Sequence, residues 1–230
     1  MKISERQEYI NLHNDREDLL LLQISDIHLW FSIKILEVLE KTIEKHKPDL
    51  VVLTGDYFDI PRGAYNFRDF LLRISLRYQV VFIKGNHDTL YGSTIFNLLL
   101  DIPNCHCIDD KMFLYESKKG YSYMISSWKN RFNLSKKTNH NNIVLLHNPE
   151  KIDENELQHI DIILAGHLHG GQVIFYKSIG TANFPGKFFY KYCMDRTRIK
   201  DTILVVSKGL GDTLPIRWNC PKEVILIHIS

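Results

Sequence analysis

The chain has 230 residues, of which 44% are hydrophobic and 24% charged, and this composition fits one globular domain with a large core. Its formal net charge of +2 and pI of about 8.2 are too mild for a specific nucleic-acid binder, where a pI above about 9 and clustered Lys and Arg are expected. The four cysteines form no C-x-x-C pair, which argues against a disulfide scaffold or a cysteine-based zinc site and favours a reduced, cytoplasmic protein. The polar start lacks the apolar core of a signal peptide, and no run approaches the roughly 18 apolar residues of a membrane helix.

Short apolar runs without alternation predict strands that are buried on both faces. These runs are residues 19–24, 50–54, 80–83, 143–146 and 161–165. Between and after them, apolar residues at helical spacing predict helices over 32–46, 66–78, 93–100 and 150–159. Strands and helices in this order predict a largely parallel sheet with right-handed crossovers.

The second half of the chain has a different pattern. Strand-like segments with little helix between them cover residues 121–126, 172–176, 202–207 and 223–229. We therefore expect an α/β sandwich with a second, more antiparallel sheet, in one domain over residues 19–230 that follows a polar segment at 1–18.

Each of the five buried runs ends in a polar block. The blocks are Asp-Ile-His at 26–28, Gly-Asp-Tyr-Phe-Asp at 55–59, Gly-Asn-His-Asp at 85–88, a histidine at 147 and Gly-His-Leu-His-Gly-Gly at 166–171. The blocks at 26–28 and 55–59 are weak signals alone, because such turns are common after strands, whereas those at 85–88 and 166–171 are more specific. The five blocks lie beyond the ends of strands, which is where open α/β sheets bind ligands, and they occur in a fixed order. These two features together point to function.

The blocks contain carboxylate, imidazole and amide side chains that could act together as metal ligands. They are Asp26, His28, Asp56, Asn86, His147, His167 and His169. The spacing of two in Asp26-Ile27-His28 and in His167-Leu168-His169 would point both side chains to one side of an extended chain. Seven such ligands are what a chain needs to hold two divalent metals about 3.5–4 Å apart.

This order of motifs resembles the calcineurin-like metallophosphoesterase superfamily over roughly residues 19–229. It is most similar to the branch of small bacterial phosphoesterases with a GHxHGGQ block, which includes phosphodiesterases and UDP-diacylglucosamine diphosphatases. The segments Ser207-Lys208-Gly209-Leu210-Gly211 and Leu214-Pro215-Ile216-Arg217 add to the resemblance. The resemblance implies an α-β-β-α sandwich in which two mixed sheets are flanked by helices.

The resemblance also implies how the ligands divide between two metals. One metal would be held by Asp26, His28, Asp56 and His169, and the other by Asp56, Asn86, His147 and His167, with Asp56 bridging. The mixed nitrogen and oxygen set suits Mn, Fe, Zn or Co, with Mg also open, and Mn is our first choice. A hydroxide that bridges the two metals would attack phosphorus at neutral pH.

Five further residues receive roles outside the metal ligands. His87 is expected to contact the phosphate and to donate a proton to the leaving oxygen. Asp88 is expected to orient His87, and Asp59 to support the loop by a hydrogen bond rather than to bind metal. Tyr57 is expected to line the cleft, and Arg217 to reach a phosphate.

The segment 183–200 alternates aromatic residues with Lys and Arg. It fits a rim for an acyl chain, a base or a membrane surface, or an irregular excursion with a partly buried aromatic cluster. Related sequences often have a glycine near its tyrosine pair, and here Cys193-Met194-Asp195 follows Tyr192 instead. Many relatives also begin with a membrane anchor that is absent here, so either the protein works in the cytoplasm, with or without peripheral membrane contact, or an anchor was removed.

The expected function is hydrolysis of a phosphodiester or diphosphate bond in a small substrate, with a lipid-linked substrate left open. A phosphomonoesterase is the main alternative, for a small molecule or a protein. A nuclease is disfavoured by the mild charge, since binding to a phosphate backbone needs many Lys and Arg contacts. A non-catalytic scaffold is disfavoured because all seven ligands and His87 are present. The oligomeric state stays open.

Overall fold

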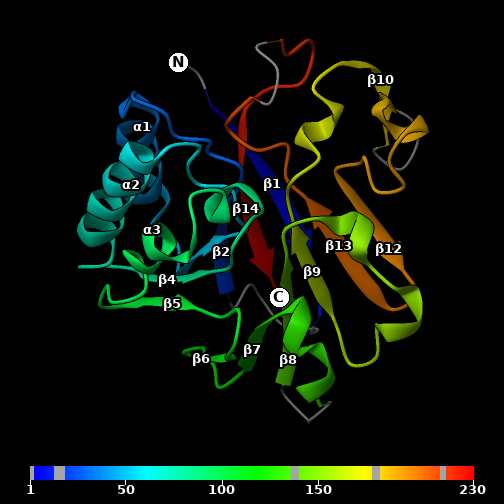
Figure 1. Ribbon diagram of the computed structural model, residues 1–230. Helices are drawn as coiled ribbons and strands as arrows, with labels where there is room; N and C mark the ends of the chain where they lie inside the picture. The colour runs from blue at the N-terminus through cyan, green and yellow to red at the C-terminus, as the bar shows by residue number, and fades with distance from the viewer. Residues whose placement is uncertain (1–2, 13–18, 136–139, 178–181, 213–215) are drawn as a thin grey trace.

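The fold is built around two six-stranded sheets (Figure 1). The computed structural model describes residues 3–12, 19–135, 140–177, 182–212 and 216–230. The first sheet has the strand order β1-β14-β2-β3-β4-β5, and the second has the order β12-β13-β9-β8-β7-β6. A small third sheet pairs β10 (Ile174–Lys177) with β11 (Asn183–Pro185).

The first sheet is mostly parallel. Its strands are β1 (Ser4–Ile10), β2 (Leu19–Ile24), β3 (Leu50–Leu53), β4 (Gln79–Phe82), β5 (Cys105–Cys107) and β14 (Glu223–Ile229). Strands β2 to β5 run parallel in chain order, and β14 lies antiparallel beside β2. The three predicted strands of this half of the chain are confirmed within a residue or two at their ends.

The second sheet has a parallel centre and antiparallel edges. Its strands are β6 (Phe113–Glu116), β7 (Ser122–Ser127), β8 (His140–Leu146), β9 (Ile162–Ala165), β12 (Arg196–Ile199) and β13 (Thr202–Val206). Strands β7, β8, β9 and β13 are parallel, while β6 and β12 pair antiparallel at the edges. The first sheet has one antiparallel pairing and the second has two, so the expectation of a second, more antiparallel sheet is confirmed, although the centre of that sheet is parallel.

Three hydrophobic layers hold the sandwich together. Helices α1 (Lys34–His46), α2 (Pro61–Ile74) and α3 (Ser93–Asn97) supply side chains to the core on the outer face of the first sheet. A second core lies between the sheets, and a third covers the outer face of the second sheet. Strand β2 is apolar apart from Gln23 because it is covered on both faces: Leu22 and Ile24 face the helices, while Leu19 and Leu21 face the other sheet. The predicted α/β class with two mixed sheets is confirmed.

The outer layer of the second sheet differs from the first in the residues that the structure describes. It contains 3₁₀ turns at Trp128–Asn133, Pro149–Lys151, Glu154–Glu156 and Gly186–Phe188, rather than α-helices. Two further 3₁₀ turns, His87–Thr89 and His169–Gly171, lie at the candidate site. The predicted helix at 150–159 is thus two short turns, because Asn148 and Asp153 each cap a turn that ends within three residues.

Two boundaries also differ from the expectation. Residues Ser4–Ile10 form an edge strand that pairs with β14, so part of the segment at 1–18 belongs to the sheet. One face of this strand is partly exposed and polar, which hides it from a search for apolar runs. Helix α2 begins at Pro61, five residues before the expected start, because proline is favoured in the first helical turn.

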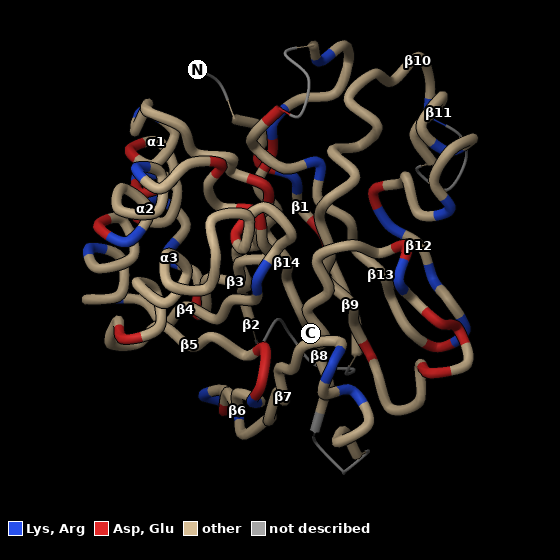
Figure 2. Tube along the Cα trace, viewed as in Figure 1, with Lys and Arg blue, Asp and Glu red and all other residues tan. Residues whose placement is uncertain are grey.

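Charges of both signs are mixed over the helical layer. Figure 2 shows Lys and Arg beside Asp and Glu along α1 and α2. Arg73 pairs with Glu40 at 3.1 Å, and Arg77 pairs with Glu44, so that acidic side chains of α1 meet basic side chains of α2 and of the turn that follows it. No helix among the described residues is long and apolar enough to cross a membrane.

Candidate metal centre

The seven predicted ligands follow the carboxyl ends of strands β2, β3, β4, β8 and β9. Five of them have a left-handed backbone, with φ of 50° at Asp26, 50° at His28, 59° at Asp56, 71° at His167 and 47° at His169. The expectation that the two D-x-H and H-x-H segments are extended is therefore wrong. Each such residue costs on the order of 1–3 kcal/mol, and strain of this kind is concentrated at functional sites.

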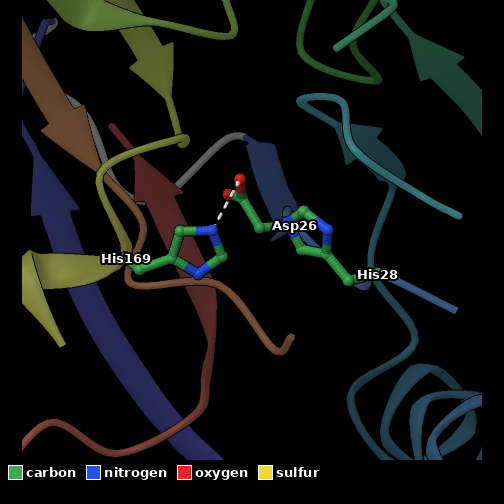
Figure 3. Close-up of side chains that lie close together, drawn as sticks. All are labelled: Asp26, His28 and His169. Carbon is green, nitrogen blue, oxygen red and sulfur yellow. Dashed lines mark ion pairs between the residues drawn. The ribbon is translucent and has the colours of Figure 1, made fainter. Parts of the chain in front are cut away.

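A first cluster joins the ends of β2 and β9. Asp26, His28 and His169 offer ligand atoms that all lie within 4.8 Å of one another, and all three residues are buried (Figure 3). Asp26 Oδ1 lies 3.7 Å from His169 Nε2, and the rings of His28 and His169 are 5.1 Å apart. The backbone N–H of His167 donates to the Asp26 carboxylate at 3.0 Å, which fixes the two loops against each other.

A second cluster joins the ends of β3, β8 and β9 and includes Asp56, His147 and His167. Its centre is His147 Nε2, which lies 3.1 Å from Asp56 Oδ2, 3.1 Å from His167 Nδ1 and 3.1 Å from Asn86 Oδ1. The other ring nitrogen of His147 contacts the carbonyl of Thr54 at 2.8 Å. Because that carbonyl can only accept a hydrogen bond, Nδ1 carries the proton and Nε2 is directed to the cluster.

Asp56 lies between the two clusters. Its Oδ2 is 3.1 Å from His147 Nε2 in the second cluster and 3.8 Å from His28 Nε2 in the first. Burial alone would raise the pKa of Asp56, but the hydrogen bond and charge of His147 outweigh it and lower the pKa to about 2. This carboxylate is therefore ionised across the physiological pH range.

The histidines titrate differently according to their neighbours. Burial alone would lower the pKa of His147, but its hydrogen bond to Asp56 and the charges of Asp26 and Asp56 raise the pKa to about 9. Burial lowers the pKa of His169 to about 4, helped by the positive charges of His28 and Arg217. In the protein alone, a proton on His147 balances carboxylates that a cation would otherwise balance.

Asp59 connects one predicted ligand to the predicted catalytic histidine. Its Oδ1 lies 2.8 Å from His28 Nδ1 and 2.7 Å from His87 Nδ1, and its Oδ2 accepts a hydrogen bond from Trp30 Nε1 at 2.6 Å. These are hydrogen-bond distances, although the group His28, Asp59 and His87 also has the spacing of a metal site. With Nδ1 of His28 bonded to Asp59, its Nε2 is left buried and without a hydrogen-bond partner, as a metal ligand would be.

Asp88 does not contact His87, contrary to the expectation that it orients that imidazole. Its carboxylate accepts hydrogen bonds from the backbone N–H groups of Asp56 at 2.8 Å, Tyr57 at 2.7 Å and Gly85 at 2.8 Å. It therefore ties the loop after β3 to the loop after β4, while Asp59 takes the place at His87. Burial raises the pKa of Asp88 to about 7, against the lowering effect of the backbone donors.

The expected substrate contact of Tyr57 is wrong. Tyr57 is fully buried, its hydroxyl donates to the carbonyl of Ile83 at 2.6 Å, and its ring stacks on Phe67 at 4.6 Å. Its neighbour Phe58 is also fully buried in the core. The loop turns at Asp56, so the two aromatic side chains that follow point into the protein.

Arg217 lies beside the first cluster, but protein groups take up its donors. Its Nη2 donates to the carbonyls of Lys208, at 2.9 Å, and of Gly211, and its Nε donates to Asp212 at 2.6 Å. The same Nη2 is 3.2 Å from His169 Nδ1. The guanidinium therefore holds the loop after β13 against the His169 loop, and the expected phosphate contact is not favoured.

A buried ion cluster below this loop was not expected from the sequence. Lys208 Nζ lies 2.7 Å from Asp195 Oδ1 and 2.9 Å from Glu223 Oε2, and Arg6 Nη2 lies 3.2 Å from Glu223 Oε1. The Lys208 side chain packs beneath Gly170, where an added Cβ would be 2.8 Å from Lys208 Cγ. The only signal in the sequence was a lysine directly after an apolar strand, within the Ser-Lys-Gly-Leu-Gly segment.

The segment 183–200 is part buried and part exposed. Tyr192 and Cys193 pack into the core on the second sheet, whereas Phe188 and Phe189 are 74% and 78% exposed. Phe184 connects the two parts, because its ring stacks on Tyr176 at 4.7 Å and meets Phe188 at 5.2 Å. The expectation of a partly buried aromatic cluster is therefore confirmed, whereas a rim for an acyl chain, a base or a membrane surface stays a prediction.

Known proteins are similar to this chain in sequence, and solved structures are similar to it in fold. The chain is 28% identical to the uncharacterized metallophosphoesterase YkuE of Bacillus subtilis, over 91% of this chain and 78% of the relative. It is 25% identical to the uncharacterized metallophosphoesterase Cj0846 of Campylobacter jejuni, over 96% of this chain but only 62% of that protein. It is 23% identical to the phosphodiesterase YaeI of Escherichia coli, over 80% of this chain and 72% of the relative.

Solved structures agree on the fold. The calcineurin-like phosphoesterase YfkN of Bacillus subtilis superposes with a TM-score of 0.51 at 14% identity, over 94% of this chain and 91% of that chain. A putative 5′-nucleotidase of Staphylococcus aureus gives 0.54 at 12% identity, over 93% of this chain and 55% of that chain. The profile of the family described as calcineurin-like phosphoesterase matches residues 19–171, a range that contains all seven predicted ligands and His87. The chain therefore belongs to the calcineurin-like phosphoesterase family and is a metal-dependent phosphoesterase.

Proposed function

We propose that the protein hydrolyses a phosphodiester or pyrophosphate bond with two divalent metal ions. The observation that carries this proposal is the position of Asp56, whose Oδ2 lies within 3.8 Å of His28 in one cluster and 3.1 Å of His147 in the other. A carboxylate that faces two separate groups of ligands is suited to join two ions.

The proposed ligand sets follow from the two clusters. Asp26, His28, Asp56 and His169 would hold one ion, and Asp56, Asn86, His147 and His167 the other. The residues fit such ions, because His28 Nε2 is buried without a hydrogen-bond partner and the donors are all nitrogen and oxygen. Mn²⁺ is our first choice, with Fe, Zn, Co and Mg as alternatives to be tested.

The ions would supply an activated water and would neutralise charge on the phosphate oxygens. The remaining chemistry falls to His87, whose side chain is 31% exposed and whose Nδ1 is held by Asp59. With Nδ1 bonded to a carboxylate, Nε2 is the atom that can contact the phosphate and donate a proton to the leaving oxygen. Burial raises the pKa of Asp59 and the hydrogen bond to His28 lowers it. The net effect is a lowered pKa, so Asp59 is an ionised hydrogen-bond acceptor for His87 Nδ1.

We propose that the substrate is a small phosphodiester or diphosphate. More specifically, we propose that this substrate is linked to a lipid. Trp30 and Phe31 follow the Asp26-His28 segment and are 57% and 70% exposed, and Phe188 and Phe189 are exposed beyond the His169 loop. Exposed aromatic side chains near the catalytic loops support contact with lipid or a membrane surface. We also propose that the protein belongs to the GHxHGGQ branch, which includes UDP-diacylglucosamine diphosphatases. We further propose that it is located in the cytoplasm.

The test compares bis-p-nitrophenyl phosphate with p-nitrophenyl phosphate. Protein is stripped of metal, reloaded with Mn²⁺ and assayed beside the variants His87→Ala and His228→Ala, the second being a histidine on β14 away from the site. We expect metal-dependent cleavage of the diester that falls at least ~10²-fold in His87→Ala and is unchanged in His228→Ala. Preference for the monoester would favour the phosphomonoesterase alternative. Absence of turnover despite two bound ions, measured by elemental analysis, would overturn the proposal.

A further inference from the structure

The 208–211 segment, which follows β13, packs against two residues of the first cluster. The backbone N–H of Gly211 donates a hydrogen bond to the carbonyl of Asp26. An added Cβ at Gly209 would lie 2.6 Å from Asp26 Cβ. An added Cβ at Gly211 would lie 2.5 Å from His28 Cβ, so neither glycine has room for a side chain. The segment therefore lies in direct contact with two of the three side chains in Figure 3.

Lys208 connects the same segment to His169, the third member of the first cluster. Its side chain packs beneath Gly170, the residue after His169. Its backbone carbonyl accepts a hydrogen bond from Arg217 Nη2 at 2.9 Å, and that nitrogen lies 3.2 Å from His169 Nδ1. All three residues of the first cluster are thus supported by the segment that Lys208 begins.

Two buried carboxylates hold Lys208 in place. Its Nζ lies 2.7 Å from Asp195 Oδ1 and 2.9 Å from Glu223 Oε2, and its backbone N–H donates to Glu223 Oε1 at 3.1 Å. Asp195 directly precedes β12 in the second sheet, whereas Glu223 begins β14 in the first sheet. Hydrogen bonds between ionised groups are roughly twice as strong as neutral ones. The amine therefore fixes the 208–211 segment against both sheets.

The second cluster has a different support. His147 is oriented by the carbonyl of Thr54, which lies 2.8 Å from its Nδ1. Among the hydrogen bonds and ion pairs that the structure describes, none joins the 208–211 segment to Asn86, His147 or His167. A change at Lys208 should therefore act on one cluster and leave the other as it is.

We propose that Lys208 is a positioning residue for the metal ion of the first cluster. Its ion pairs hold the 208–211 segment, and this segment holds Asp26, His28 and His169 at the separation that an ion requires. An ion binds more tightly to ligands that are already held in place, because it does not have to order them. The inference rests on the proposed two-metal function and adds that each ion depends on its own supporting residues.

The test variant is Lys208→Met, which keeps a long unbranched side chain and removes its charge. We expect this variant to fold, because Glu223 keeps Arg6 as a partner at 3.2 Å and Asp195 keeps Lys177. Should it not fold, Glu223→Gln takes its place, since that change removes a charge opposite Lys208 and keeps the size of the side chain.

The matched control is Thr202→Val at the other end of β13. Thr202 is buried, and its hydroxyl donates to the carbonyl of Ile160 at 2.7 Å, away from both clusters. Loss of this hydrogen bond should lower the Tm without changing the metal centre. The control therefore separates a general loss of stability from an effect on the site.

The measurement is calorimetric titration of Mn²⁺ into metal-stripped protein, in two backgrounds that each keep one complete set of ligands. His167→Ala removes a proposed ligand of the second ion, and His28→Ala removes one of the first. We expect Lys208→Met to weaken Mn²⁺ binding about tenfold in His167→Ala and less than about twofold in His28→Ala. Thr202→Val should leave Mn²⁺ binding unchanged in both backgrounds. With no other change, Lys208→Met should need about tenfold more Mn²⁺ for hydrolysis of bis-p-nitrophenyl phosphate and recover full activity at saturating Mn²⁺.

The outcomes separate this inference from the proposed function. Equal losses of affinity in both backgrounds, or no loss in either, would show that Lys208 does not position the first ion. The proposed function would still stand if wild type binds two ions and cleaves the diester. If wild type binds two ions without hydrolysis, the proposed function is wrong, whereas a loss confined to His167→Ala still supports the role of Lys208. If wild type binds one ion only, the two-metal function is wrong, and the role of Lys208 stands only if Lys208→Met and His28→Ala both weaken that ion.

Discussion

Asp59 offers the sharpest test of how this centre is organised. One of its oxygens accepts from the Nδ1 of both His28 and His87, and the other accepts from Trp30. An asparagine side chain at this position would have one oxygen and one amide group in their place. If its oxygen faces the two imidazoles, its NH₂ meets the indole N–H, and if it is flipped, its NH₂ meets two ring N–H groups. At least one hydrogen bond is lost in either orientation, together with the negative charge.

The size of the effect follows from these contacts. Loss of a partner that orients a metal ligand typically costs about 10–100-fold in metal affinity or activity. Asp59 orients His28, a proposed ligand, and also His87, the proposed acid, so we expect Asp59→Asn to lower kcat/KM about 10²-fold. That factor corresponds to about 2.7 kcal/mol of transition-state stabilisation.

The assay is hydrolysis of bis-p-nitrophenyl phosphate by Mn²⁺-loaded protein, with the exposed acid replaced in Asp101→Asn as the control. The double variant Asp59→Asn/His87→Ala should lose less than the product of the two single losses, because the part of the Asp59 effect that acts through His87 is already absent in His87→Ala. Metal content should be measured in parallel, since a weakened His28 would reduce the occupancy of one ion. An Asp59→Asn enzyme with full activity and full metal content would refute this account, and so would fully additive losses.

The other predictions concern metal binding, packing and pH. Chelation should abolish hydrolysis and lower the Tm, with both restored by added metal, because an ion that binds only the folded state stabilises it; an unchanged Tm would contradict a built-in site. Tyr57→Phe should lose about 1–2 kcal/mol of unfolding free energy in denaturant titrations, with KM unchanged, because its hydroxyl is bonded in the core; a raised KM would restore its substrate role. Gly85→Ala should fold less stably and bind metal weakly in calorimetry, because its Cβ would lie 2.1 Å from Asp56 Oδ1. The charge of Lys208 opposes burial and lowers the pKa of Asp195 to about 2, so this carboxylate adds stability above about pH 4 that is lost as the pH falls toward 2. That loss is about 2 kcal/mol of unfolding free energy. It is measured by acid unfolding of wild type and of Asp195→Asn. The same pH dependence in both proteins would show that the Asp195–Lys208 ion pair does not contribute to stability.

The sequence was sufficient for the parts of the site that depend on position along the chain. Continuous apolar runs predicted the central strands, since a strand covered on both faces cannot alternate with polar residues. Parallel strands end at one edge of a sheet, so the polar residues directly after them had to be neighbours. Asp26, His28, Asp56, His147, His167 and His169 were brought together for this reason.

Only the tertiary structure decided how side chains from different loops face one another. Asp59 and His87 are 28 residues apart, and nothing in either motif shows that Asp59, rather than the adjacent Asp88, reaches the imidazole. The left-handed backbone at Asp56 turns Tyr57 into the core, which a residue list cannot show. The edge strand Ser4–Ile10 and the buried partners of Lys208 likewise depend on segments far away in the chain. Strand periodicity is a local property and can be read locally, whereas the direction of a side chain in a turn is set by long-range packing and hydrogen bonds.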